Sequence, residues 1–231
     1  MDVLGPMRLD EQGDPLYGPR DTPDFAKMAA LGLPFSIAGG QCGPDHLRRA
    51  RAAGAVGVQL GSVFALCEEF DLDPRLRREL VERELRSAPT VRHDPAASPT
   101  TFPLKVADLP GTLADPRVSA ARTRVCDLGY LRTPYRTERG AVDYRCPAEP
   151  GAMYVRKGGA AEQTEGRQCL CNGLLAAVGL GQRRPRGTVE PPIVTIGQDL
   201  GFLRQIAPQG RSYSAESVVR WLSAGLAEAS M

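Results

Sequence analysis

Residues 33–62 read LPFSIAGGQCGPDHLRRARAAGAVGVQLGS, and this stretch decides the fold class of the chain. Residues 33–38 are a short apolar run closed by two glycines, a pattern typical of a buried strand. Residues 44–53 then have the spacing of an amphipathic helix, with a proline suited to its first turn. Residues 55–60 form a second apolar run, which predicts a second buried strand.

The segments on either side extend this order of strand, helix and strand. Residues 63–69 continue as a helix, and such alternation implies a parallel sheet with right-handed crossovers. Both an open doubly wound sheet and a (β/α) barrel have this alternation of strands and helices. Upstream, residues 7–17 have the pattern of a hairpin and residues 23–31 that of a helix. We therefore assign residues 1–72 to one α/β domain.

The pattern changes after this domain, and we assign residues 73–231 to a helical and loop-rich extension packed on it. A helix is predicted to begin at Pro74 and to end near Ser87. Residues 89–187 are rich in Pro, Gly, Arg and Thr and have weak periodicity except around residues 170–180, which indicates a loop-rich segment. A short strand is expected over residues 194–196, followed by a C-terminal helix.

Composition sets the broad class of protein. The chain has 231 residues, 42% of them hydrophobic and 24% charged, which is enough to bury a core. It lacks the roughly 20 consecutive apolar residues of a membrane helix, and its first residues lack the apolar segment of a secretory signal. We therefore expect a cytoplasmic protein without membrane contact, whose six cysteines are reduced thiols.

The charge pattern does not indicate nucleic-acid binding. The net charge is +2, and the basic residues are scattered among a similar number of acids, whereas nucleic-acid binders usually concentrate positive charge on one face. Arg183, Arg184 and Arg186 form the tightest basic cluster, between two glycines, which is typical of a solvated loop. We expect no nucleic-acid partner.

Both predicted strands end in glycine turns that lead into helices. The residues of these turns are Gly39 and Gly40 in the first, and Gln59, Leu60, Gly61 and Ser62 in the second. Glycine lets the backbone approach a ligand closely, and a following helix N-terminus offers free N–H groups to an anion. In (β/α)8 barrels the loops after the seventh and eighth strands form the usual phosphate site. The pattern favours phosphate binding, although glycines also make tight strand-to-helix turns in many α/β proteins.

The same residues carry a resemblance to the nitronate monooxygenase family, formerly called 2-nitropropane dioxygenases. Residues 34–40, PFSIAGG, and 53–69, AGAVGVQLGSVFALCEE, look like the last two strands of that family. The likeness continues in residues 98–105, 126–131, 144–147 and 169–174, which read SPTTFPLK, CDLGYL, YRCP and CLCNGL. It covers most of the chain, and its barrel-end motif recurs in related FMN barrels.

The resemblance implies an α/β fold that is a partial (β/α)8 TIM-barrel, whose last two strand-helix units form an FMN phosphate site. The implied reaction is the oxidation of alkyl nitronates by O2 to carbonyl compounds and nitrite, so FMN is the expected cofactor and the nitronate and O2 are the expected partners. The residues that match the family's phosphate-binding positions are Gly39, Gly40, Gln59, Leu60, Gly61 and Ser62. Ser62 replaces the usual threonine but keeps the hydroxyl.

The family's earlier strands, and its histidine that follows two glycines and acts as a base, have no counterpart in this sequence. His46 and His93 stand in other contexts, so we assign neither a catalytic role. We expect a truncated chain whose activity in isolation stays open. Two strands cannot close a barrel, so a homo-oligomer or a complementing N-terminal chain is the expected macromolecular partner.

Two alternatives to this function remain. In the first, the chain is a flavin-free binding or scaffold module with a metal held by Cys126, Cys146, Cys169 and Cys171. Zinc and iron-sulfur centres accept four thiolates, but only two of these cysteines are close in sequence, so we assign no metal ligand. In the second, the phosphate site serves an enoyl reductase-like FMN barrel. Flavin absorbance, metal content and NAD(P)H consumption separate the three functions.

Overall fold

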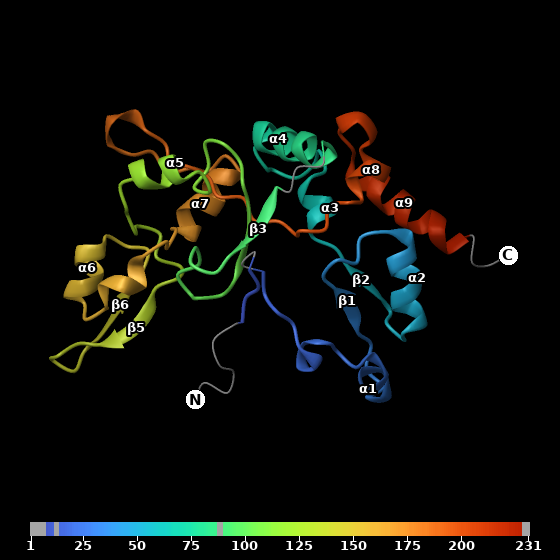
Figure 1. Ribbon diagram of the computed structural model, residues 1–231, viewed down its shortest axis with the longest axis horizontal. Coiled ribbons are helices and arrows are strands. Elements are labelled where there is room, and N and C mark those ends of the chain that lie inside the picture. Colours follow the sequence, from blue (N-terminus) through green and yellow to red (C-terminus); the bar gives the residue numbers. More distant parts are fainter. Residues whose placement is uncertain (1–7, 12–13, 87–89, 228–231) are drawn as a thin grey trace. The chain divides into compact units, whose positions relative to one another are not determined.

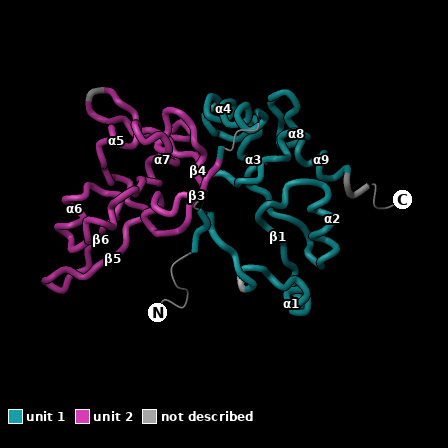
Figure 2. The backbone as a smooth tube through the Cα atoms, viewed as in Figure 1, with its two compact units in different colours: residues 1–90, 196–231 teal, residues 91–195 magenta. Residues whose placement is uncertain are grey.

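The computed structural model describes residues 8–11, 14–86 and 90–227 (Figure 1). These residues form a mixed α/β structure with three two-stranded sheets and no closed barrel. The chain divides into two compact units, residues 1–90 with 196–231 and residues 91–195 (Figure 2). Their limits differ from the predicted division at residue 72, because the C-terminal segment packs with the first unit.

The first unit contains the predicted parallel strands. Strand β1 (Ser36–Ala38) pairs with β2 (Gly57–Gln59) in parallel, and helix α2 (Pro44–Ala52) connects them. Ile37, Ala50 and Ala55 are buried together, since each presents an apolar side chain between the strands and the helix. The predicted order of strand, helix and parallel strand is confirmed.

Helices complete the first unit. These are α1 (Phe25–Ala30), α3 (Ser62–Ala65), α4 (Pro74–Leu85), α8 (Leu203–Ile206) and α9 (Ala215–Ala227), with 3-10 turns at Pro19–Asp21 and Pro208–Gly210. Helix α4 begins as predicted, because the Asp73 carboxylate accepts a hydrogen bond from the Arg75 amide and a proline follows it. Its predicted end, Ser87, lies outside the described residues.

The expected hairpin of residues 7–17 is described only in part. Leu9 and Pro15 form an antiparallel bridge. Met7 and the turn residues Gln12 and Gly13 lie outside the described residues.

The second unit contains two antiparallel hairpins and three α-helices among its described residues. Strands β3 (Val91–Asp94) and β4 (Leu104–Ala107) form one hairpin, and β5 (Thr133–Arg136) and β6 (Val142–Arg145) form the other. The helices are α5 (Pro116–Ala121), α6 (Gly151–Arg156) and α7 (Leu170–Ala177), with 3-10 turns at Ala161–Thr164 and Pro185–Gly187. Its apolar core is Ala97, Val106, Leu113, Leu170 and Ile193.

The structure corrects several sequence predictions. The assignment of residues 89–187 to loops is wrong for the four strands. Strands β5 and β6 are almost entirely exposed, so they carry no alternating apolar face. Helix α3 ends at Ala65 rather than near residue 69, and the expected strand over 194–196 is only an isolated bridge between Thr195 and Val106.

The interpretation of the arginine cluster as a solvated loop is wrong for Arg184. Its guanidinium is half-buried and pairs with the carboxylates of Glu190 and Asp127. In the part of the chain that the structure describes, no helix has the length and apolar character needed to cross a bilayer.

Candidate functional site

The two glycine turns leave the parallel sheet at the same edge. Ala38 lies opposite Gln59 in the register, so the residues that follow each of them emerge from neighbouring strand ends (Figure 1). We call this set the glycine edge, and its members are Gly39, Gly40, Gln59, Leu60, Gly61 and Ser62. The strand pairing thus brings together two segments that the sequence placed in one predicted site.

The backbone of the glycine edge is open to solvent. Gly39 has φ +80° and Gly40 has φ +61°, a region that residues with side chains rarely adopt. A Cβ atom built at Gly39, Gly40 or Gly61 meets no atom within 4 Å. A ligand can therefore approach the main chain at both turns without displacing a packed side chain.

The main-chain amides at this edge are unused. Among the described residues, no hydrogen bond engages the amide of Gly40, Gly61 or Ser62. By contrast, the carbonyl of Gly61 accepts bonds from the amides of Phe64 and Ala65 in the turn that opens α3. Amides without a hydrogen-bond partner in the protein are the donors that an anionic oxygen requires.

A contact between distant segments fixes Ser62. Its hydroxyl oxygen accepts a hydrogen bond of 2.9 Å from the amide of Gly197, and a Cβ atom built at Gly197 would lie 2.7 Å from that oxygen. The hydroxyl keeps its own proton and can still donate a hydrogen bond to a ligand. Sequence reasoning missed Gly197, because no local pattern links two residues this far apart in the chain.

Asp199 places a negative charge near Cys42, which follows the first glycine turn. The pKa of Cys42 is raised to about 12 by burial and by the negative charge of Asp199. Cys42 is therefore a neutral thiol at physiological pH. Asp199 itself is exposed, so solvent screens its charge.

The two histidines belong to different units. His46 is in α2, with its Nδ1 atom 3.3 Å from where a Cβ atom of Gly43 would be. His93 is in β3 of the second unit. Neither lies among the six residues of the glycine edge, and we leave both without a role.

The structure brings the four cysteines of the second unit together. Cys146 and Cys169 are buried in one cluster with Ala148, and the half-buried Cys126 and Cys171 pack against it. All four are free thiols. The spacing in sequence gave little reason to expect this, because the cysteine-bearing segments are far apart along the chain.

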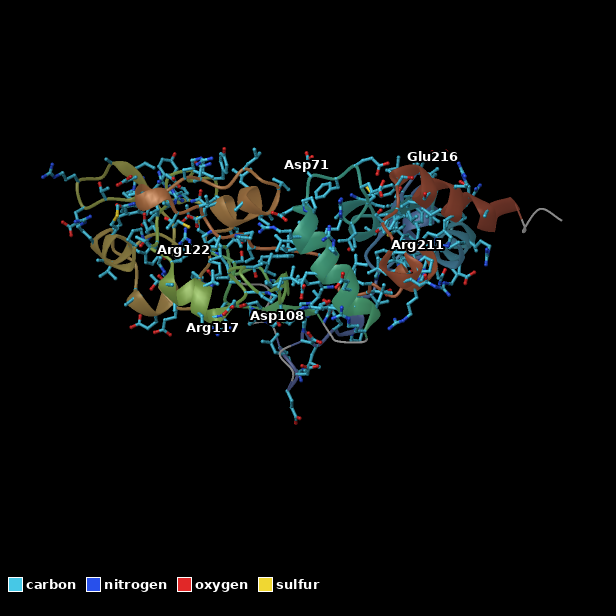
Figure 3. All side chains as sticks on the ribbon, turned by 90° about the horizontal axis from the view of Figure 1, so that it is seen from above. Asp71, Asp108, Arg117, Arg122, Arg211 and Glu216 are labelled. Atoms are coloured by element: carbon cyan, nitrogen blue, oxygen red, sulfur yellow. The ribbon has the colours of Figure 1, made fainter. Side chains whose placement is uncertain are left out.

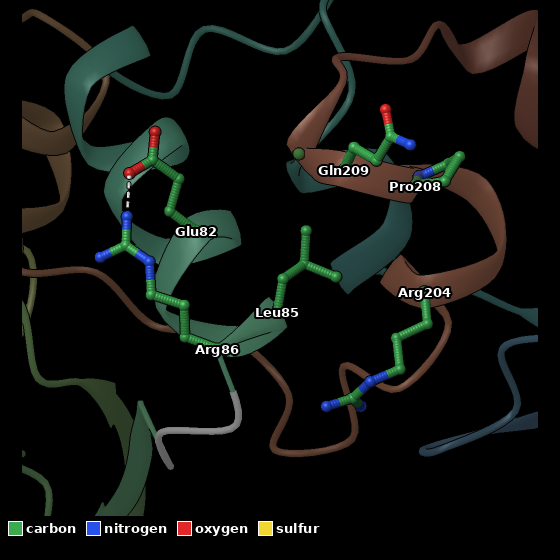
Figure 4. Close-up of a pocket in the computed structure, with 7 residues that line it drawn as sticks. Glu82, Leu85, Arg86, Arg204, Pro208 and Gln209 are labelled. Carbon is green, nitrogen blue, oxygen red and sulfur yellow. Dashed lines mark hydrogen bonds and ion pairs between the residues drawn. The ribbon is translucent and has the colours of Figure 1, made fainter.

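A groove of about 560 Å³ lies in the first unit, away from the predicted site residues (Figure 4). Glu82 and Leu85 of α4, with Arg86 directly after it, line one side, and Arg204 and Pro208 line the other. Glu82 and Arg86 pair with each other at 3.0 Å, so their charges are largely satisfied within the protein. None of the glycine-edge residues lines this groove.

Comparisons with known proteins gave no relative: no protein-family model, no curated protein and no solved structure matches this chain. The class that the described residues define is therefore a mixed α/β protein with a solvent-open glycine edge.

Proposed function

We propose that this chain belongs to an FMN-dependent oxidoreductase of the nitronate monooxygenase type, and that the glycine edge binds the phosphate of FMN. The observation that carries the proposal is the set of unused amides at Gly40, Gly61 and Ser62, which leave the ends of two parallel strands. In this proposal β1 and β2 are the last two strands of a (β/α)8 barrel.

The residues present fit a phosphate group. The amides donate to its oxygens, the Ser62 hydroxyl adds a further donor, and the glycines at 39, 40 and 61 let the oxygens approach the main chain. Gln59, which is exposed beside them, can donate its side-chain amide to the phosphate or to a flavin ring edge. Bound FMN would supply the oxidation of an alkyl nitronate by O2 to a carbonyl compound and nitrite.

A pair of isosteric substitutions at Gly61 tests the phosphate assignment. Gly61 has φ −108° and open space at its Cβ position, so a side chain there strains neither the backbone nor the packing. Gly61→Asp places a carboxylate at the proposed phosphate, whereas Gly61→Asn places a neutral amide of the same shape. We expect Gly61→Asp to weaken FMN binding by roughly ten-fold or more relative to Gly61→Asn, a cost of about 1.4 kcal/mol.

Titration of the full chain with FMN and with riboflavin provides the readout, by quenching of flavin fluorescence. The phosphate site predicts tighter binding of FMN than of riboflavin in the unsubstituted chain and no effect of Gly61→Asp on riboflavin. Equal affinities for the two flavins, or equal effects of the two substitutions on FMN, would show that the edge does not bind phosphate. NADH or NADPH consumption by the flavin-loaded protein would instead favour the enoyl reductase alternative.

A further inference from the structure

The cysteine cluster of the second unit differs from an ordinary apolar core. The members described for it are Cys126, Cys146, Ala148, Cys169 and Cys171. The neighbouring core in the same unit is built from Ala97, Val106, Leu113, Leu170 and Ile193. Apolar burial alone favours large aliphatic side chains, since the gain grows with the area removed from water. A cluster composed almost wholly of thiols therefore needs a reason other than packing.

Several N–H groups point at the sulfur atoms. The Arg132 Nε atom donates to Cys126 Sγ at 3.4 Å, and the Asn172 Nδ2 atom donates to Cys169 Sγ at 3.4 Å. The backbone N–H groups of Ala148 and Asn172 also face Cys146 and Cys169. N–H donors of this kind stabilise negative charge on sulfur.

Polar contacts order the segments that carry the cysteines. The Asn172 side chain donates to Asp127 at 2.8 Å as well as to Cys169, and so links the segment after Cys126 to the start of α7. The carboxylate of Glu149 accepts from the Cys146 amide at 3.5 Å and from Lys157 at 2.8 Å. The Asn172 contacts thus join two of the cysteine-bearing segments, and the Glu149 contacts order the third within itself.

We propose that Cys126, Cys146, Cys169 and Cys171 bind one zinc ion as a structural four-thiolate site. Zinc accepts four cysteine sulfurs in a tetrahedron, and thiolates are the soft ligands that select it over magnesium or calcium. Binding releases one proton from each of the four thiols and leaves a site of net charge −2. Arg132 beside Cys126 and Lys157 beside Glu149 partly offset that charge.

The sulfurs are gathered but not yet arranged around one point. Among the described residues, no group of three or more His, Cys, Asp or Glu side chains lies in an arrangement that could hold a metal ion. A thiol reaches a new position by rotation about a single side-chain torsion. We therefore expect zinc to draw the half-buried sulfurs of Cys126 and Cys171 toward the buried pair. This site stands independently of flavin binding, which is assigned to the other unit.

Metal analysis of the full chain, purified under reducing conditions without added metal or chelator, tests the site. We expect about one zinc per chain. In the chain stripped of zinc, added Co²⁺ should give the near-ultraviolet thiolate-to-cobalt bands and the visible bands of a tetrahedral site. Cys146→Ser should lose both the zinc and the cobalt bands. The matched control is Cys67→Ser, which also alters a buried cysteine, lies outside the cluster and should keep both.

The cobalt spectrum of the unsubstituted chain keeps the test decisive even if Cys146→Ser fails to fold. A chain without zinc that gives no thiolate-to-cobalt bands would overturn the proposal, as would equal metal loss from Cys67→Ser. Stoichiometric iron with sulfide, or a disulfide between Cys126 and Cys146 in place of metal, would also overturn the zinc assignment.

Discussion

Glu190 is a buried carboxylate held between two arginines of the second unit. Its side chain is 2% exposed and pairs with Arg184 at 2.7 Å. It also pairs with Arg122, which is labelled in Figure 3 and whose side chain is 5% exposed. A buried charge is tolerated only while its partner is present, because the surrounding protein cannot solvate it. Removing one member of such a set leaves the other charges without compensation.

Glu190→Gln should therefore destabilise the protein by about 3–5 kcal/mol, although the shape of the side chain is nearly preserved. Urea unfolding followed by circular dichroism measures the change. The control is Glu216→Gln in α9, because Glu216 and its partner Arg220 are 77% and 78% exposed. An exposed pair contributes about 0–1 kcal/mol. Similar losses in the two variants would contradict the role given to burial.

The contact between Ser62 and Gly197 makes a second prediction about single residues. Gly197→Ala would place its Cβ atom 2.7 Å from the Ser62 hydroxyl oxygen, so this substitution should destabilise the chain by about 1–3 kcal/mol. Ser62→Ala removes that oxygen, and the cost of Gly197→Ala should be smaller in the Ser62→Ala background. A double-mutant cycle of unfolding free energies measures the coupling. Strict additivity would show that the two residues do not meet.

The N-terminus of helix α9 is hydrogen-bonded by a carboxylate from another segment of the chain. Glu69 accepts hydrogen bonds from the Ala215 amide at 2.9 and 3.0 Å, where the first amides of the helix lack partners within it. This contact lowers the pKa of Glu69. Because the pKa in the folded state lies below that in the unfolded state, the stabilisation is present above pH of about 4.3 and is lost as the pH falls below it.

Glu69→Gln should remove the pH dependence of the unfolding free energy that comes from the Glu69 carboxylate. We expect the difference in unfolding free energy between the original chain and Glu69→Gln to be greatest near neutral pH and to shrink as the pH falls below about 4. Unfolding curves at several pH values measure it. The effect is small, since Glu69 is exposed and solvent screens its charge. A difference that grows on acidification would contradict the assignment.

Local patterns predicted the elements whose determinants lie close together in the chain. Helices α2 and α4 begin at a proline, and α4 adds the Asp73 cap, so a few adjacent residues define each start. The proximity of the two glycine turns was also predictable from local sequence, because parallel pairing places the ends of successive strands side by side. Strands β5 and β6 were not predicted. Val142 and Tyr144 are exposed, so these strands lack the alternating buried apolar residues by which a strand is recognised in sequence. The Gly197 contact and the cysteine cluster depend on the path of the whole chain.

The molecule as a whole contains two units with separate cores. Ile37, Ala50 and Ala55 lie in the core of the first unit, whereas Val106 and Ile193 lie in that of the second. Local stability can therefore differ between them. The two destabilising substitutions described above, Glu190→Gln and Gly197→Ala, fall in different units.

Hydrogen exchange should resolve these units. Glu190→Gln should reduce amide protection mainly within residues 91–195, and Gly197→Ala mainly within the described parts of residues 1–90 and 196–231. Exchange resolved by peptide mass spectrometry measures both. A uniform loss of protection across the chain in each variant would instead indicate a single cooperative unit.

The most direct measurement of the central claim is an amide NMR titration of the full chain with FMN. The account predicts that the amide resonances of Gly40, Gly61 and Ser62 shift most, that inorganic phosphate shifts the same resonances, and that riboflavin leaves them nearly unchanged. Resonances at the glycine edge that stay fixed while FMN binds elsewhere, or no shift at any amide at saturating FMN, would contradict it.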